Sequence, residues 1–249
     1  MAGVMSKDVI KGFLQALAPF SELSAPELET LAAGARSVTV RKGARVFEEG
    51  SPADCCLVLT SGRAKIVLSG DNGSEILLRI IKPVSLVGEV ALLDRSTRSA
   101  SLVAMESCHF IRISAALFEQ MRRNAAFEWR MVARVASMLR DAGDHVRGVS
   151  TFPAVTRVAW CLGRLARQEG RFEGTTVVIP KLAHHELAEM TGCSRETVSR
   201  ALSTLRRKKY VTWDDHTVRL EMGGLQRLLG GQLETTANLA YTLGPLGLG

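Results

Sequence analysis

Gly192-Cys-Ser-Arg-Glu-Thr-Val-Ser-Arg200 is the stretch that decides the fold of this 249-residue chain. It has the pattern of the turn and second helix of a helix-turn-helix. Gly192 stands where a tight turn between helices needs a residue free to take a positive φ. Ser194 is a good N-cap for the helix that follows. An apolar stripe at helical spacing then predicts the face that packs on the domain core: Val198, Ala201, Leu202 and Leu205.

The opposite face of this helix carries side chains that can reach base edges or phosphates in a major groove. They are Arg195, Glu196, Ser199 and Arg200. An ordinary solvated face is the alternative. The spacing of Ala188, Gly192 and Ser194, followed by the basic run 206–209 with Lys208, favours DNA binding instead. Thr191 departs from the pattern because an aliphatic residue is expected there.

The composition is that of a soluble globular protein, with 46% hydrophobic and 23% charged residues. The length allows two domains, and the net charge of +7 suits a polyanionic partner. No run approaches the roughly 18–20 apolar residues of a membrane span, and the first 13 residues do not read as a signal peptide. Five scattered cysteines indicate a reducing compartment. We therefore expect a cytoplasmic protein with no membrane partner.

From residue 38 to 113 the hydrophobic pattern has the period of β-strands, with glycines between the runs. The expected strands are 38–40, 45–47, 57–59, 64–68, 75–81 and 108–113. Many short strands at regular spacing predict a small antiparallel barrel or roll. Helical patterning precedes this region, and a helix start is expected at Ser24. The fold class is therefore α+β.

A long helix is expected over 127–149, ending at Thr151-Phe-Pro153. Its apolar stripe is too long for a small roll to cover, so we expect the helix to pair with its copy in a dimer, although an intramolecular core is the alternative. The stripe consists of Trp129, Val132, Val135, Ala136, Leu139 and Val146. A helix over 154–170, a strand over 176–179 and a closing hairpin over 210–220 should surround the helix-turn-helix as a winged helix. Another helical stretch is expected around 225–233.

A second motif runs from Gly88 to Ala100. A glycine followed by a one-turn helix offers free backbone N–H groups to an anion. Glu89 and Arg98 are nine positions apart and can face one pocket, where the carboxylate would accept from a ligand hydroxyl and the guanidinium would bind a phosphate. The alternative is a surface Glu–Arg ion pair on a loop.

These motifs, together with Gly43-x-x-x-Phe47-x-x-Gly50 and Ser61-Gly62-Arg63, resemble the cyclic AMP receptor protein/fumarate-nitrate regulator family over about residues 15–222. The resemblance implies a homodimer that binds double-stranded DNA at two half-sites, with RNA polymerase as a candidate protein partner. It implies a cyclic-nucleotide-binding β-roll, a long dimerisation helix and a C-terminal winged helix-turn-helix. The corresponding expected domains are 1–124, 125–150 and 151–222, with an extension over 223–249.

The resemblance also implies roles for single residues. Glu89 would hold the ribose 2′-hydroxyl, Arg98 would pair with the cyclic phosphate, and Gly88 with Ser99 and Ala100 would lie against it. Arg195, Glu196 and Arg200 fall on base-reading positions. Ser194 and Thr197 fall on phosphate-contacting ones, and His185 lies where a polar DNA contact can occur.

The identity of the effector stays open. Ala142 and Gly143 stand where members that respond to cyclic AMP carry hydroxyl side chains for adenine, and neither can donate a side-chain hydrogen bond. Arg79 could serve a guanine or a larger dinucleotide. Cyclic AMP, cyclic GMP and cyclic di-GMP are therefore all candidates.

The sequence favours a regulator over an enzyme because it has no nucleophile triad, phosphate-binding loop or zinc spacing. No metal is expected, since Cys55 and Cys56 are adjacent in a strand and point to opposite faces. Two alternatives remain. One is a constitutive DNA binder whose roll has lost its ligand. The other is a cyclic-nucleotide sensor that acts through protein–protein contact.

Overall fold

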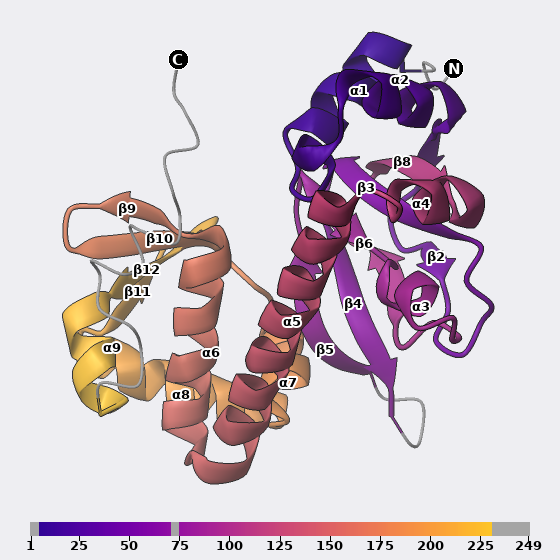
Figure 1. Ribbon diagram of the computed structural model, residues 1–249. Helices are drawn as coiled ribbons and strands as arrows, with labels where there is room; N and C mark the ends of the chain where they lie inside the picture. The colour runs from indigo at the N-terminus through magenta and orange to yellow at the C-terminus, as the bar shows by residue number, and fades with distance from the viewer. Residues whose placement is uncertain (1–4, 71–74, 231–249) are drawn as a thin grey trace. The chain divides into compact units, whose positions relative to one another are not determined.

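The computed structural model describes residues 5–70 and 75–230. The chain divides into two compact units, Met1–Arg140 and Asp141–Gly249, and the division falls inside one long helix (Figure 1). The predicted domain boundaries at 124, 150 and 222 remain predictions.

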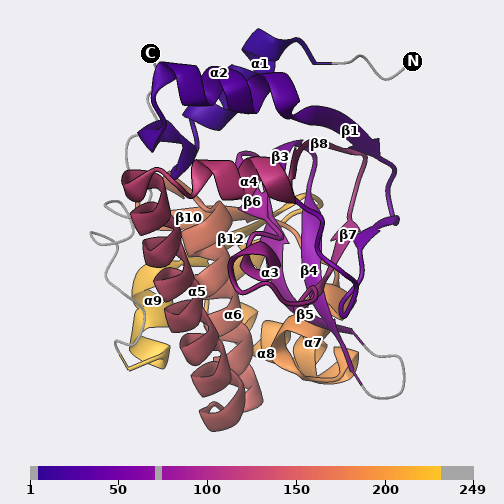
Figure 2. The same cartoon turned by 45° about the vertical axis from the view of Figure 1, so that its right-hand side comes forward.

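Short helices open the first unit: α1 (Lys7–Gln15), the 3₁₀ helix η1 (Phe20–Glu22) and α2 (Ala25–Gly34). The predicted helix start at Ser24 is confirmed. Both the backbone N–H and the hydroxyl of Ser24 donate to Glu27 Oε2, at 2.8 and 2.7 Å. This capping arrangement satisfies the helix end. The helices lie at one end of the roll, beside β1 and β8 (Figure 2).

The roll consists of two four-stranded antiparallel sheets, ordered β1-β8-β3-β6 and β2-β7-β4-β5. The strands are β1 (Arg36–Val40), β2 (Arg45–Phe47), β3 (Cys55–Ser61), β4 (Ala64–Ser69), β5 (Glu75–Ile81), β6 (Ser85–Val87), β7 (Ser101–Ala104) and β8 (Cys108–Ser114). The predicted roll and its expected strands are confirmed. The sequence prediction missed β6 and β7, because three or four residues carry too little periodicity to be recognised.

Strand β3 is buried on both of its faces. Cys55, Leu57 and Leu59 belong to the hydrophobic cluster inside the roll. Cys56 and Val58 belong to a separate cluster that includes the core residues of α1, α2 and α4. The two adjacent cysteines therefore point in opposite directions, as predicted from the pleat of a strand.

Helices α3 (Val90–Leu93), α4 (Ala115–Met121) and α5 (Ala125–Thr151) complete the first unit and lead out of it. The predicted long helix is confirmed, with 27 residues. Asn124 Oδ1 accepts from the backbone N–H groups of Ala126 and Phe127, at 3.0 and 3.1 Å, and so caps its start. The helix ends before Pro153, as expected.

The second unit holds a four-stranded sheet, ordered β11-β12-β10-β9, and a group of helices. Its elements are α6 (Ala154–Glu169), β9 (Arg171–Glu173), β10 (Thr176–Pro180), α7 (His184–Thr191), α8 (Arg195–Arg207), β11 (Val211–Trp213), β12 (Thr217–Glu221) and α9 (Met222–Leu228). The predicted winged helix is confirmed, although β9 was missed. Residues 231–233 of the expected last helical stretch lie outside the described residues.

Candidate effector pocket and DNA-binding surface

Arg98 is held inside the roll rather than on its surface. Only 4% of the residue is exposed. Its Nη1 donates to the Gly88 carbonyl and its Nη2 to the Cys55 carbonyl, both at 2.7 Å. Its guanidinium carbon lies 4.4 Å from the centroid of the Phe47 ring. Arg98 lies on a loop, yet its side chain is part of the core of the roll.

One donor of this guanidinium is left over. Within the part of the chain that the structure describes, the buried Nε of Arg98 has no hydrogen-bond partner. A buried unsatisfied N–H of a charged group is costly unless a ligand or water accepts from it. The position suits an anionic group.

Gly88 makes this arrangement possible. Its φ is +80°, and a Cβ atom built on it would lie 2.6 Å from Arg98 Nη1. A side chain at this position would displace the guanidinium, so glycine is required for the close approach as well as for the backbone conformation. The expected one-turn helix follows as α3.

Glu89 is the most buried acidic residue among those described, with 1% of it exposed. Its Oε1 accepts from Arg134 Nε on α5 at 2.6 Å, and Arg134 Nη2 also donates to the Leu86 carbonyl at 2.6 Å. The alternative of a surface ion pair between Glu89 and Arg98 is therefore wrong. The sequence analysis missed Arg134, because it is 45 residues away from Glu89 and no local pattern links the two.

The remaining candidate effector residues lie close to Arg98 in the chain or on β5. The backbone of Arg98 is paired with the segment 50–51: its carbonyl accepts from Gly50 at 2.8 Å and its N–H donates to the Ser51 carbonyl at 2.9 Å. Ser99 is exposed and Ala100 is buried. Arg79 is half-buried on β5, opposite Ile66 of β4.

The helix-turn-helix has the predicted local geometry. Gly192 takes the left-handed conformation, with φ 61°, and ends α7. Ser194 caps α8 by accepting from the Thr197 backbone N–H at 3.2 Å. The predicted stripe is buried on one side of α8: Val198, Ala201, Leu202 and Leu205.

The opposite side of α8 is open to solvent. Exposed side chains there are those of Ser194, Arg195, Glu196, Ser199 and Arg200, while Thr197 is half-buried. His185 on α7 and Lys208, which caps the end of α8, are also exposed. These positions remain candidate DNA contacts.

The charge of Glu196 is supported locally. Its own backbone N–H and the Ser194 hydroxyl hold the pKa of this carboxyl below its usual value. The carboxylate is therefore ionised at neutral pH, and it can accept from an amino group such as that of cytosine.

Thr191, the polar departure in the pattern, is buried and satisfied. Its hydroxyl donates to the Leu187 carbonyl at 2.6 Å. Its own carbonyl accepts from Arg157 Nη1 at 3.1 Å, and Arg157 Nη2 donates to the Phe152 carbonyl at 3.2 Å. Arg157 therefore connects the turn of the helix-turn-helix to the start of α6.

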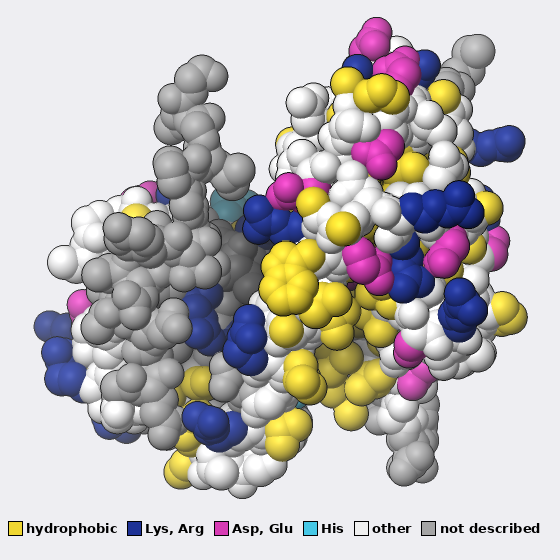
Figure 3. Space-filling model, viewed as in Figure 1, with side chains coloured by type: hydrophobic (Ala, Val, Ile, Leu, Met, Phe, Trp, Pro, Cys, Tyr) yellow, Lys and Arg dark blue, Asp and Glu magenta, His cyan; other side chains and the backbone are white. Residues whose placement is uncertain are grey.

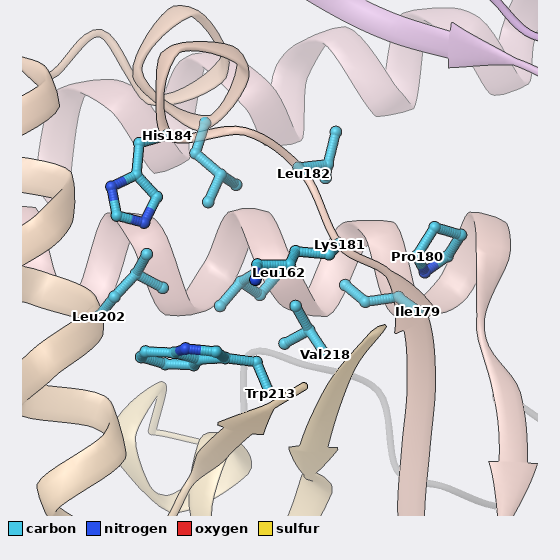
Figure 4. Close-up of a pocket in the computed structure, with 10 residues that line it drawn as sticks. Leu162, Ile179, Pro180, Lys181, Leu182, His184, Leu202, Trp213 and Val218 are labelled. Carbon is cyan, nitrogen blue, oxygen red and sulfur yellow. The ribbon is translucent and has the colours of Figure 1, made fainter. Parts of the chain in front are cut away.

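A small cavity of about 30 Å³ lies under the helix-turn-helix, lined by residues of α6, α7, α8 and the wing (Figure 4). Leu162, Leu202 and Trp213 make it largely apolar, with His184 at one side. Its volume holds about one water molecule, far below the roughly 300 Å³ of the smallest ligand sites. We regard it as a packing defect of the winged helix.

Large hydrophobic side chains are exposed along α5 (Figure 3). They are Trp129, Val132, Val135, Leu139 and Val146, with Trp129 71% and Leu139 74% exposed. Outside α5, the described residues include two more exposed large hydrophobic side chains, those of Val9 and Ile76. The stripe predicted from the sequence is therefore largely uncovered in the single chain.

The described residues contain neither a cluster of metal-binding side chains nor a helix suited to a membrane. No group of three or more His, Cys, Asp or Glu side chains among them is placed to hold a metal ion. Across residues 5–70 and 75–230, no helix combines the length and the apolar character that crossing a membrane requires.

Each of the two units contains a segment that matches a known domain family. Residues 37–125 match the cyclic nucleotide-binding domain family. Residues 156–228 match the Crp-like helix-turn-helix domain family. A cyclic-nucleotide-binding fold and a DNA-binding fold on one chain define a one-component transcription regulator.

The relatives specify the family. The chain is 32% identical over 189 residues to a cyclic AMP receptor protein of Thermus thermophilus, covering 74% of this chain and 83% of the relative. It is 27% identical over 179 residues to a CRP-like cAMP-activated global transcriptional regulator of Mycobacterium tuberculosis, covering 71% and 80%. The chain belongs to the cyclic AMP receptor protein/fumarate-nitrate regulator family.

Solved structures agree on the fold. A CooA variant from Carboxydothermus hydrogenoformans matches with a TM-score of 0.69 at 21% identity, covering 87% of this chain and 93% of the other. The c-di-GMP responsive regulator CLP of Xanthomonas campestris matches with a TM-score of 0.65 at 21% identity, covering 79% and 99%.

Proposed function

We propose that this transcription regulator is a cytoplasmic homodimer whose affinity for DNA is set by cyclic AMP or cyclic GMP bound in the roll. The main observation behind this proposal is the buried guanidinium of Arg98, whose Nε–H has no hydrogen-bond partner in the described chain. Gly88 lets this guanidinium approach the backbone of the motif, because a Cβ atom at this position would lie 2.6 Å from Arg98 Nη1. A cyclic phosphate is an anion that can accept from Nε.

The buried carboxylate of Glu89 supports a ligand that also carries a hydroxyl. A carboxylate accepts strongly from a ribose 2′-hydroxyl. Arg98 donates to the carbonyl of Gly88, the residue directly before Glu89. The groups that we propose for the phosphate and for the ribose therefore meet at neighbouring residues of the chain. Ser99, Ala100 and Arg79 are the further residues that we assign to the pocket.

The exposed stripe of α5 supports the dimer. Trp129, Val132, Ala136 and Leu139 follow the alternating three- and four-residue spacing of a coiled-coil seam, and Val146 continues it. A second copy of α5 would bury this stripe. Two recognition helices would then meet half-sites about one DNA turn apart.

The exposed face of α8 supports base reading by Arg195, Glu196 and Arg200. Ser194, Thr197, Ser199, His185 and Lys208 would contact phosphates or the groove edge. RNA polymerase is the protein partner that we propose for such a regulator, whether it activates or represses transcription.

Cyclic di-GMP is a second candidate effector. Ala142 and Gly143 are exposed on α5 and offer no side-chain donor to an adenine. Arg79 offers a guanidinium of the kind that pairs with guanine.

Calorimetric titration of the protein with cyclic AMP, cyclic GMP and cyclic di-GMP, followed by DNA binding with and without each, tests the proposal. We expect one of the two mononucleotides to bind and to tighten DNA binding. A preference for cyclic di-GMP would support the second candidate. Tight DNA binding with no ligand bound at millimolar concentration would instead identify a constitutive regulator.

A further inference from the structure

The exposed face of α8 continues past the candidate base readers and carries an arginine, Arg207, at its far end. Resting on the proposed DNA-binding function, we propose that Arg207 binds a phosphate of the DNA backbone beside each half-site, and that the tip of the wing, residues 214–216, makes no such contact. The end of the recognition helix would then hold the backbone that flanks the bases it reads.

Helical spacing puts Arg207 in line with the residues that we assign to base reading. The members of this row, at intervals of four, three and four residues, are Glu196, Arg200, Ser203 and Arg207. Side chains at such intervals lie on one face of a helix, and all four are exposed. The buried stripe that begins at Val198 occupies the opposite face. Arg207 therefore belongs to the surface that would meet DNA.

The length of the row takes Arg207 past the bases. Arg207 stands eleven residues after Glu196, which corresponds to about 16 Å along the axis of an α-helix. The first turns of a recognition helix contact base edges, and the major groove is about 12 Å wide. The end of the helix therefore reaches the ridge of phosphates, as the end of the recognition helix does in homeodomains. A planar guanidinium is well suited to two oxygens of one phosphate.

The side chain of Arg207 is available for such a contact. Its neighbour Arg206 lies over the ring of Trp213 in the wing, 5.1 Å from the ring centroid. Arg219 of the wing donates to Glu173. In the described part of the chain, by contrast, no hydrogen bond or ion pair engages the Arg207 side chain. The guanidinium can therefore bind a phosphate without giving up a partner.

The tip of the wing carries charge of the wrong sign for a phosphate. Asp214 and Asp215 are both exposed in the turn between β11 and β12. Asp214 Oδ1 accepts from the backbone N–H groups of His216 and Thr217, at 2.9 and 2.7 Å. These bonds, with that of His216 foremost, lower the pKa of Asp214 to about 2, so this carboxyl is ionised at neutral pH. Two carboxylates side by side would repel the backbone.

The end of α8 gathers more positive charge directly after Arg207. Lys208 caps the helix, and Lys209 follows in the left-handed conformation with φ 59°. Glycine is the usual residue at this position of a helix end, so a lysine there adds a charge at a conformational cost. Cations also stabilise the negative end of a helix dipole. A role in the dipole alone is therefore the alternative that the test must separate from phosphate binding.

The test measures DNA affinity as a function of salt concentration. The full-length protein first selects its preferred duplex from a random library, in three series with cyclic AMP, with cyclic GMP and without a nucleotide. Fluorescence anisotropy then compares this selected duplex with a random-sequence duplex. Arg207→Gln should weaken binding to both duplexes by a similar factor, roughly tenfold, and should flatten the salt slope by about one unit for each subunit. Arg207→Lys keeps the charge and should recover most of the slope.

Arg171→Gln is the matched control. The side chain of Arg171 on β9 is 77% exposed and pairs with Glu173 at 2.6 Å. The substitution removes the same charge from the same unit but not from the row, so the salt slope should not change. Asp215→Asn should also leave the slope unchanged, because the tip of the wing does not meet the backbone. Thermal unfolding of each variant confirms that the fold is intact.

The outcomes separate this inference from the proposed function. An unchanged salt slope in Arg207→Gln would overturn the inference, because the charge would then serve only the helix end. A loss confined to the selected duplex would also overturn it, since Arg207 would then read a base. A steeper slope in Asp215→Asn would do the same by placing the tip of the wing at the backbone.

Two results for the wild-type protein bear on the proposed function. Failure to bind any duplex in all three series would overturn the proposed function, and this inference with it. Tight DNA binding that no cyclic nucleotide alters would overturn the proposed control by an effector. The inference on Arg207 would then still stand or fall by the salt slope.

Discussion

A Cβ atom on Gly148 of α5 would lie 2.6 Å from the ring of Trp160 on α6. The indole therefore rests directly on the backbone of α5 within the second unit. The same indole lies 6.3 Å from the Phe152 ring and stacks on Arg164 at 5.0 Å. This contact secures the end of the long helix against the DNA-binding fold.

Gly148→Ala should therefore destabilise the protein, by about 1–3 kcal/mol, because the added methyl overpacks against a rigid ring. Denaturant unfolding measures the change. Gly12→Ala in α1 is the control: nothing lies within 4 Å of the added atom, so the usual gain for alanine in a helix, about 0.5–1 kcal/mol, should appear. A gain of that size at Gly148 would contradict the contact.

His145 should make this region sensitive to acid. Its Nδ1 lies 2.7 Å from Arg164 Nη1, and a guanidinium can only donate, so the imidazole accepts and is neutral. Burial first, and then the charge of Arg164, lower the pKa of His145 below 6.5. The neutral imidazole therefore contributes stability that is fully present above about pH 6.5. This contribution is lost as the pH falls through the lowered pKa of His145.

Unfolding free energies measured from pH 8 to pH 5 would reveal this dependence. We expect wild-type stability to fall at the acid end and His145→Gln to show a flatter profile, because glutamine can accept but does not titrate. Identical slopes for the two proteins between pH 7 and pH 5 would be evidence against it.

Arg98→Leu should abolish effector binding and also weaken the fold. The buried carbonyl of Cys55 and the half-buried carbonyl of Gly88 would lose their donors, at a cost of about 1–3 kcal/mol. Glu89→Gln should be milder, since the amide can still accept from a hydroxyl. Calorimetry and thermal unfolding report the two effects. Arg95→Leu, in the same motif but with a side chain that is 81% exposed, should change neither.

Substitutions on the recognition helix should separate base readers from phosphate contacts. Arg195→Ala and Arg200→Ala should each cost about 1–3 kcal/mol at one base position. Lys208→Ala should weaken binding to all sequences alike and lower the salt slope by about one unit. Fluorescence anisotropy with specific and random duplexes distinguishes them. Equal losses on both duplexes for Arg200→Ala would make that residue a phosphate contact.

Leu139→Asp should convert the proposed dimer to a monomer, since it introduces a charge at the centre of the exposed stripe. Sedimentation velocity measures the oligomeric state. Val9→Asp, at another exposed hydrophobic residue on α1, is the control and should leave the dimer intact. A dimer that survives Leu139→Asp would indicate a different interface.

The hydrophobic periodicity and the capping residues of the sequence are sufficient to predict the architecture of the chain. Long strands such as β5, with the predicted bounds 75–81, and the caps at Ser24, Gly192 and Ser194 rest on local rules that neighbouring residues carry. Strands β6, β7 and β9 escaped prediction because their pairing partners, and not their own residues, define them.

The site was harder to predict than the fold. Gly88, Glu89 and Arg98 could be chosen from one motif, yet their actual partners come from elsewhere. Cys55, Phe47 and Arg134 lie on distant segments that only the folded chain brings together. A buried arginine on a loop looks the same in a sequence as an exposed one.

Strand β3 separates two hydrophobic compartments, each formed by one of the two core clusters of the first unit. Its odd-numbered side chains, Cys55 to Leu59, belong to the compartment of Phe47 and Val87, next to the effector motif. Cys56 and Val58 belong to the compartment filled by the N-terminal helices and Phe127 at the start of α5. Neighbouring positions of one strand can therefore vary independently. Substitutions on the face of β3 next to the effector motif can change ligand preference, while the packing at the start of α5 on the other face is preserved.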